Sequence, residues 1–122
     1  MSVRTVTTLN LERETILNPN YRVVIYTGEF QLVLMSLKPQ EEIGCEAHEN
    51  SDQFFRVERG NGLAILNGIS YVLTDGASFV VPCGTFHNII NTSTTENLKL
   101  YTIYSHPQHN PHAAQKDKPA DD

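Results

Sequence analysis

Short apolar runs recur along this chain at even spacing, and turn-forming residues separate them. The runs are rich in Val, Ile, Leu, Tyr and Phe, which is typical of β-strands bounded by turns. The pattern predicts strands at residues 21–27, 30–37, 53–58, 63–66, 71–73, 78–81, 86–91 and 98–104. No segment shows a convincing helical period. Regular short strands of this kind favour an all-β jelly-roll β-barrel built from two antiparallel sheets.

One stretch of the chain holds several glycine, proline and histidine residues at set intervals. Gly76 is followed after five residues by Pro82, which forms a Pro-x-Gly bend with Gly84, and His87 and Asn91 follow. This order of residues resembles the second conserved motif of the cupin family, and every fixed position of that motif is filled. The resemblance implies a cupin jelly roll that holds a metal ion, with His87 as one ligand.

A partner motif lies upstream in altered form. The first cupin motif contains a His-x-His pair, a Glu five residues later and a closing Gly, and here these positions hold Glu46, His48, Gln53 and Gly60. Two ligand positions are therefore substituted, yet the exchanged set still has one carboxylate beside neutral donors. The charge offered to a divalent ion is unchanged. The resemblance therefore implies a retained metal site at Glu46, His48, Gln53 and His87.

The role of Gln53 has two interpretations. An amide oxygen is a weaker ligand than a carboxylate, so Gln53 either binds the ion directly or hydrogen-bonds to the groups around it. In the second case Glu46, His48 and His87 form the two-histidine, one-carboxylate face associated with iron(II) sites that have open positions. Mn, Fe, Co, Ni and Zn all suit such a donor set, and the sequence does not choose among them.

The alternation of side chains along strands predicts which residues surround the ion. Glu46 and His48 are two residues apart, so we expect them to share one face of a strand. By the same rule Phe55, Val57 and Ile89 face inward and line the cavity near the metal. The inner wall is then mostly apolar with a few polar anchors, as is usual for small-molecule sites.

The outward-facing residues and the charge of the chain bear on partners. Phe54, in an outer apolar patch with Ile90, suits the sheet-to-sheet contact that many cupins use, so we expect a homodimer. The net charge of −5 and a pI near 5.4 disfavour nucleic-acid and membrane partners. No signal-peptide pattern occurs in residues 1–20, and we expect a cytoplasmic protein. We also expect Cys45 and Cys83 to be small buried or half-buried fillers, with no disulfide framework.

The length of 122 residues fits one domain of ordinary size. We place the cupin β-barrel domain, with an N-terminal strand, at residues 1–105. Residues 106–122, with three prolines and little apolar content, predict an irregular tail. Its histidines, His106, His109 and His112, fit either a second metal site, a ligand on a lid, or a solvated tail. We leave them outside the active site.

The pattern over about residues 30–109 resembles small single-domain cupins described as mannose-6-phosphate isomerase-like. Three functions fit the chain. The first is a metal-dependent enzyme of isomerase, lyase or dioxygenase type that acts on a small oxygenated molecule. The second is a non-catalytic module that binds a sugar or a small acid, and the third is a metal-free structural dimerisation domain. No catalytic acid or base is evident beyond Glu46 itself or Tyr101 and Tyr104, and the alternation does not assign the facing of the two tyrosines.

Overall fold

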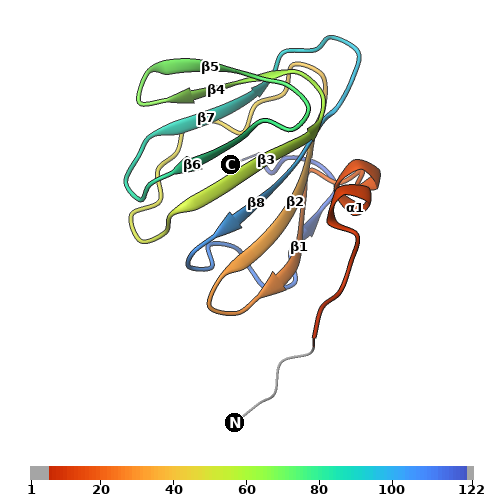
Figure 1. Cartoon of the computed structure of the whole chain (residues 1–122), viewed down its shortest axis with the longest axis vertical. Coiled ribbons are helices and arrows are strands. Elements are labelled where there is room, and N and C mark those ends of the chain that lie inside the picture. The colour runs from red at the N-terminus through yellow and green to blue at the C-terminus, as the bar shows by residue number, and fades with distance from the viewer. Residues whose placement is uncertain (1–5, 121–122) are drawn as a thin grey trace.

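The computed structural model describes residues 6–120, which form two antiparallel sheets and one short helix. The elements in chain order are α1 (Leu11–Leu17), β1 (Arg22–Thr27), β2 (Gln31–Leu37), β3 (Gln53–Arg59), β4 (Gly62–Leu66), β5 (Ile69–Leu73), β6 (Ser78–Val81), β7 (His87–Asn91), β8 (Leu98–Tyr104) and β9 (Ala114–Gln115). The six-stranded sheet has the order β6-β3-β8-β2-β1-β9, and the three-stranded sheet has the order β5-β4-β7. Figure 1 shows the three-stranded sheet at the top, the larger sheet curving below it, and α1 beside β2.

The eight strands predicted from the apolar runs are confirmed, each within two residues of its expected bounds. The all-β jelly roll of two antiparallel sheets is confirmed as well. Within residues 6–120 no ladder between named strands joins the two sheets into a closed barrel. The same residues contain no helix that is both long and apolar enough to span a membrane.

The core lies between the inward faces of the two sheets. Phe55 and Val57 of β3, Leu100 of β8 and Ile89 of β7 are all almost completely buried and belong to one apolar cluster. Because side chains alternate along a strand, Gln53 shares the inward face of β3 with Phe55 and is itself buried. A polar side chain therefore enters the interior at the start of β3.

The expectation that the chain contains no helix is wrong, because α1 forms one at residues 11–17. The Asn10 side chain accepts a hydrogen bond from the backbone N–H of Arg13 and caps the helix. Thr15 is fully buried, and α1 packs against β2, β3 and β8. A seven-residue helix is too short for a clear period and depends on this packing for its stability.

The tail prediction is corrected in part. Most of residues 106–120 lie outside regular structure, but Ala114–Gln115 form β9, which pairs with Arg22–Val23 of β1. Arg22 Nη1 donates a hydrogen bond of 2.6 Å to Gln115 Oε1 across this pair. Residues 1–5 of the predicted domain and 121–122 of the predicted tail lie outside the described residues. The division at residue 105 stays a prediction.

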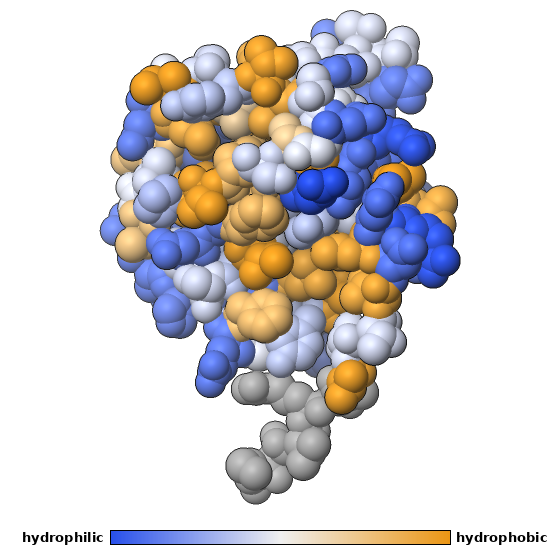
Figure 2. Space-filling view, in the orientation of Figure 1, coloured by the Kyte–Doolittle hydropathy of each residue, from blue (hydrophilic) through white to orange (hydrophobic). Residues whose placement is uncertain are grey.

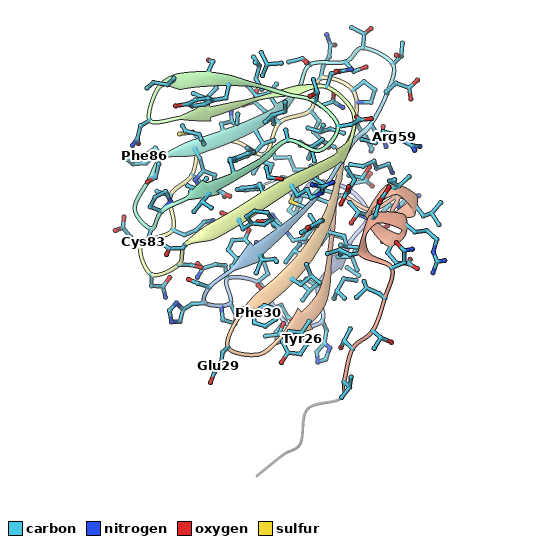
Figure 3. All side chains as sticks on the ribbon, viewed as in Figure 1. Tyr26, Glu29, Phe30, Arg59, Cys83 and Phe86 are labelled. Atoms are coloured by element: carbon cyan, nitrogen blue, oxygen red, sulfur yellow. The ribbon has the colours of Figure 1, made fainter. Side chains whose placement is uncertain are left out.

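The β1–β2 hairpin forms where the sequence places a turn. The backbone N–H of Gly28 donates a 2.8 Å hydrogen bond to the carbonyl of Phe30. Tyr26 and Phe30 lie side by side at this turn, with their ring centroids 5.1 Å apart (Figure 3). Gly28 and Glu29 thus lie in the tight turn between β1 and β2, in the gap between the two predicted strands.

The expected outer patch of Phe54 and Ile90 is wrong, because the two residues lie in different sheets. Phe54 is half-buried and its ring lies 6.3 Å from that of Tyr101 on the neighbouring strand. Other apolar side chains are exposed on the edge strands of the two sheets, with Ile69, Tyr71 and Val72 on β5 and Val80 on β6. Figure 2 shows hydrophobic side chains scattered among hydrophilic ones over the face seen in Figure 1.

Candidate metal centre

Two backbone hydrogen bonds join the two motifs that the sequence singles out. Glu46 and His87 each donate a backbone N–H to the carbonyl of the other, at 2.9 Å in both directions. The pair is an isolated bridge, so the expectation of a regular strand through Glu46 and His48 is wrong. The backbone N–H of Gly84 in turn donates a 2.8 Å bond to the carbonyl of His48. The Pro-x-Gly bend thus holds the loop that carries His48.

Three of the four predicted ligands converge in the folded chain. Glu46, His48 and His87 each offer a ligand atom, and these atoms lie within 4.8 Å of one another. Glu46 Oε1 lies 3.3 Å from His48 Nε2 and 3.6 Å from His87 Nε2. The cluster has the composition of a two-histidine, one-carboxylate metal face. Its role in binding an ion stays a prediction.

His87 is presented to the cluster as a lone-pair donor. Its side chain is 1% exposed, and its Nδ1 lies 3.0 Å from the carbonyl oxygen of Thr85. A carbonyl oxygen only accepts hydrogen bonds, so Nδ1 donates to it, and in the neutral imidazole Nε2 then has the lone pair. This buried Nε2 has no hydrogen-bond partner within residues 6–120.

Gln53 is oriented by the neighbouring strand β8. The Thr102 hydroxyl donates to the carbonyl of Phe54 at 2.8 Å, so its oxygen accepts the Gln53 Nε2 hydrogen at 2.9 Å. The amide NH₂ group therefore faces Thr102. The oxygen, Oε1, is turned the other way and is buried without a hydrogen-bond partner among the described residues.

The Glu46 carboxyl supplies the negative charge of the cluster. Burial raises the pKa of Glu46, but its contacts with His48 and His87 outweigh burial and lower the pKa from 4.5 to about 2. The group is therefore ionised at neutral pH. The set of Glu46, His48, Gln53 and His87 carries one negative charge when both histidines are neutral.

These donors fit a divalent transition metal. The two buried atoms without partners, Gln53 Oε1 and His87 Nε2, are both electron-pair donors, and leaving such groups unsatisfied costs about 1–3 kcal/mol each. A cation is the kind of partner that satisfies them. Nitrogen and oxygen donors of this mixture suit Mn, Fe, Co, Ni or Zn.

Tyr104 is a residue of the site that the sequence did not assign. It is buried, and the edge of its ring packs on His48 with centroids 5.3 Å apart. Burial, together with the charge of Glu46, raises the pKa of the Tyr104 hydroxyl, so it is neutral at physiological pH. The alternation of side chains on β8 could have assigned it to the interior. Tyr104 shares its face of the strand with the apolar Leu98 and Leu100, whereas Tyr101 shares its face with Lys99.

The predicted cavity-lining residues all lie in the interior. Phe55, Val57 and Ile89 are fully buried in the apolar core. The Phe55 ring meets His87 edge-on at a centroid distance of 5.9 Å and stacks on Phe79 at 4.9 Å. Phe55 thus contacts the cluster directly. The role of the three residues as walls of a ligand cavity stays a prediction.

The two cysteines differ from expectation. Cys45 and Cys83 are both free thiols and both exposed, so they are not buried fillers. The backbone N–H of Cys83 donates to the Asp52 carboxylate at 2.8 Å, and this contact holds the bend from outside. Figure 3 shows Cys83 and Phe86 at one edge of the molecule.

Comparison with known proteins agrees with this geometry. The cupin-domain family model matches residues 33–104. Protein L612 of Acanthamoeba polyphaga mimivirus is 50% identical over 107 residues, which are 84% of this chain and 67% of that protein. YrkC of Bacillus subtilis is 44% identical over 108 residues, and the match spans 83% of this chain but only 58% of YrkC.

A solved structure gives the same picture. The crystal structure of BH2720 from Bacillus halodurans superposes with a TM-score of 0.87 at 37% sequence identity, and the match covers 90% of this chain and 88% of that one. The residues matched by the family model include β3 and β7, the strands that carry Gln53 and His87. The chain belongs to the cupin family.

Proposed function

We propose that this cupin binds one divalent transition metal and acts as a metal-dependent enzyme on a small oxygenated molecule. Glu46, His48 and His87 are the ligands, and Gln53 Oε1 is the fourth. The observation that carries the proposal is the buried Nε2 of His87, which lies 3.6 Å from the Glu46 carboxylate and has no hydrogen-bond partner among the described residues.

Glu46, His48, His87 and Gln53 would hold the ion, and a metal with only four protein ligands would keep room for a substrate oxygen. When bound, the ion polarises a carbonyl or hydroxyl oxygen of that substrate. Phe55 shields the buried face of His87, and Thr102 holds the Gln53 amide in one orientation. The reaction types that fit are isomerisation, lyase chemistry and dioxygenation, and the resemblance to mannose-6-phosphate isomerase-like cupins is part of this proposal.

The first test is the metal content of the protein. Elemental analysis after purification without chelator or metal-affinity tag is expected to give close to one equivalent of a transition metal per chain. His48→Ala and His87→Ala are expected to lose most of it, whereas Gln53→Ala loses less because a neutral amide is the poorest ligand. His112→Ala, at an exposed histidine in the tail, is the matched control. Unchanged metal content in both histidine variants would contradict the site.

A binding module without turnover uses the same metal site, and it is the second candidate because Glu46 is the only carboxylate in the cluster. Screening the metal-loaded protein against sugar phosphates, diketones, thiols and hydroxynitriles distinguishes the two. Turnover that His87→Ala abolishes supports the enzyme. Saturable binding with no turnover supports the module, and absence of metal even after reconstitution supports a structural domain.

We further propose that the protein is a homodimer. The support is the apolar surface of the edge strand β5, where Ile69 is 58% exposed and Val72 is 77% exposed. An unpaired edge with exposed apolar side chains favours association with another chain.

A further inference from the structure

The end of β8 brings a tyrosine hydroxyl to the metal centre and connects it to the C-terminal segment. Tyr104 is the last residue of β8 and lies in register with Gln53 of β3 on one side and Gln31 of β2 on the other. Side chains in register on adjacent strands share a face of the sheet. All three are buried. They form a polar row across the inner face at the level of the predicted metal ligands.

Gln31 holds the C-terminal segment against this row by hydrogen bonds. Its Oε1 accepts hydrogen bonds from the backbone N–H groups of Gln108 and His109, both at 3.0 Å, and its Nε2 donates to the carbonyl of His109 at 2.8 Å. Gln31 is fully buried, and an unsatisfied buried amide is costly. The backbone at residues 108–109 is therefore held in place independently of the His109 side chain.

From this position the His109 side chain contacts Tyr104. Its Nε2 lies 3.1 Å from the Tyr104 hydroxyl oxygen, and the two rings meet at 72°. The tyrosine ring also packs edge-on against His48, at 88°. Tyr104 thus contacts both a predicted metal ligand and a histidine of the tail, and its hydroxyl is in hydrogen-bond distance of that tail histidine.

We propose that the Tyr104 hydroxyl donates a hydrogen bond to the small molecule held on the open side of the metal, and that His109 is the positioning residue, whose Nε2–H donates to the hydroxyl oxygen and so leaves the hydroxyl hydrogen for the ligand. The inference rests on the proposed metal site. A hydroxyl in this place suits a ligand with a carboxylate, enolate or similar anionic oxygen, because hydrogen bonds to charged acceptors are the stronger ones. The C-terminal segment then belongs to the ligand site and is not only a solvated tail.

Cobalt(II) substitution with azide as the probe tests the proposal. The wild-type protein is loaded with Co²⁺ and titrated with azide, and visible absorption gives the affinity. Tyr104→Phe is expected to retain one Co²⁺ and to bind azide about tenfold more weakly, which corresponds to the loss of one hydrogen bond to a charged group. His109→Ala keeps the backbone anchor of Gln31 and is expected to show a smaller loss of azide affinity. Tyr101→Phe, on the outward face of β8, is the control and is expected to bind azide like the wild type.

The outcomes separate the two levels of the proposal. Azide affinity unchanged in Tyr104→Phe, with Co²⁺ retained, overturns the role of the hydroxyl and leaves the metal site standing. Azide affinity unchanged in His109→Ala overturns the positioning role. Loss of Co²⁺ in Tyr104→Phe shows a structural role instead and also overturns the inference. A wild-type protein that binds no Co²⁺ overturns the metal site itself.

Discussion

Gln53 occupies a predicted ligand position with an amide in place of a carboxylate, and its amide is held by one hydroxyl group. Thr102 donates to a backbone carbonyl and therefore presents only an accepting oxygen to Gln53. Without that acceptor the amide has no contact that holds its NH₂ group toward Thr102 and leaves Oε1 without a partner. Thr102, which is not a predicted ligand, thus determines which atom of Gln53 would be available to an ion.

Thr102→Val keeps the shape of the side chain and removes the acceptor, so we expect metal affinity to fall by about tenfold or more. Competition with a chromophoric chelator measures this affinity. Thr74→Val, at an exposed threonine, serves as the control and should bind metal like the wild type. Equal affinity in Thr102→Val would show that Gln53 is not a ligand or is held by other contacts.

Glu46 predicts a pH dependence of the stability of the metal-free protein. Its folded-state pKa is lowered to about 2 from 4.5, so the unfolded chain binds a proton on this group before the folded chain does. The stabilisation is complete above pH 4.5 and is lost as the pH falls from there through about 2. Glu46→Gln should therefore lose less stability than the wild type between about pH 5 and about pH 3.

Urea unfolding of the metal-free proteins across this range measures the effect. Glu49→Gln, at an exposed carboxylate in the same loop, is the control and should follow the wild type. If Glu46→Gln and the wild type lose stability in parallel as the pH falls, the coupling of Glu46 to the two histidines is absent.

At the scale of elements, the alternation along strands was enough to locate the eight main strands and the inward faces of β3 and β7. It also placed Gln53 and His87 on the correct faces. The sequence pattern did not predict helix α1, because seven residues are too few for a clear helical period and the helix depends on contacts with distant strands. The contact of His109 with Tyr104 was not predicted for a related reason. Gln31, which holds the backbone of His109, lies 78 positions before it in the sequence.

The pairing of β4 with β7 depends on one glycine. A Cβ atom on Gly62 would lie 2.5 Å from the backbone oxygen of Ile90, so the two strands must move apart to accept any side chain. We expect Gly62→Ala to lower the free energy of unfolding by about 1–3 kcal/mol. Urea denaturation monitored by circular dichroism measures it.

Gly68→Ala is the comparison, because a Cβ there meets nothing within 4 Å and the cost comes only from its positive φ of 81°. That cost is about 1–2 kcal/mol. A Gly62→Ala protein as stable as the wild type would contradict the close contact with Ile90.

At the scale of the whole molecule, the apolar edge strands predict self-association. Light scattering is expected to give a mass twice that of the 13.7 kDa chain. Val72→Lys, which places a charge on the exposed edge strand β5, is expected to shift the protein toward the monomer. Thr94→Lys, at an exposed position between β7 and β8, is expected to leave the mass unchanged. A wild-type mass of one chain would rule out the dimer.

The C-terminal segment also covers the outer edge of β1. Besides the β9 pairing, the backbone N–H groups of Tyr21 and Val24 donate to the carbonyls of Lys116 and Ala113 at 3.0 and 2.9 Å. These bonds occupy polar groups that an uncovered edge strand would offer to other polypeptides. A chain cut before Ala113 would therefore expose a template for intermolecular strand addition, so the end of the C-terminal segment protects the protein against aggregation.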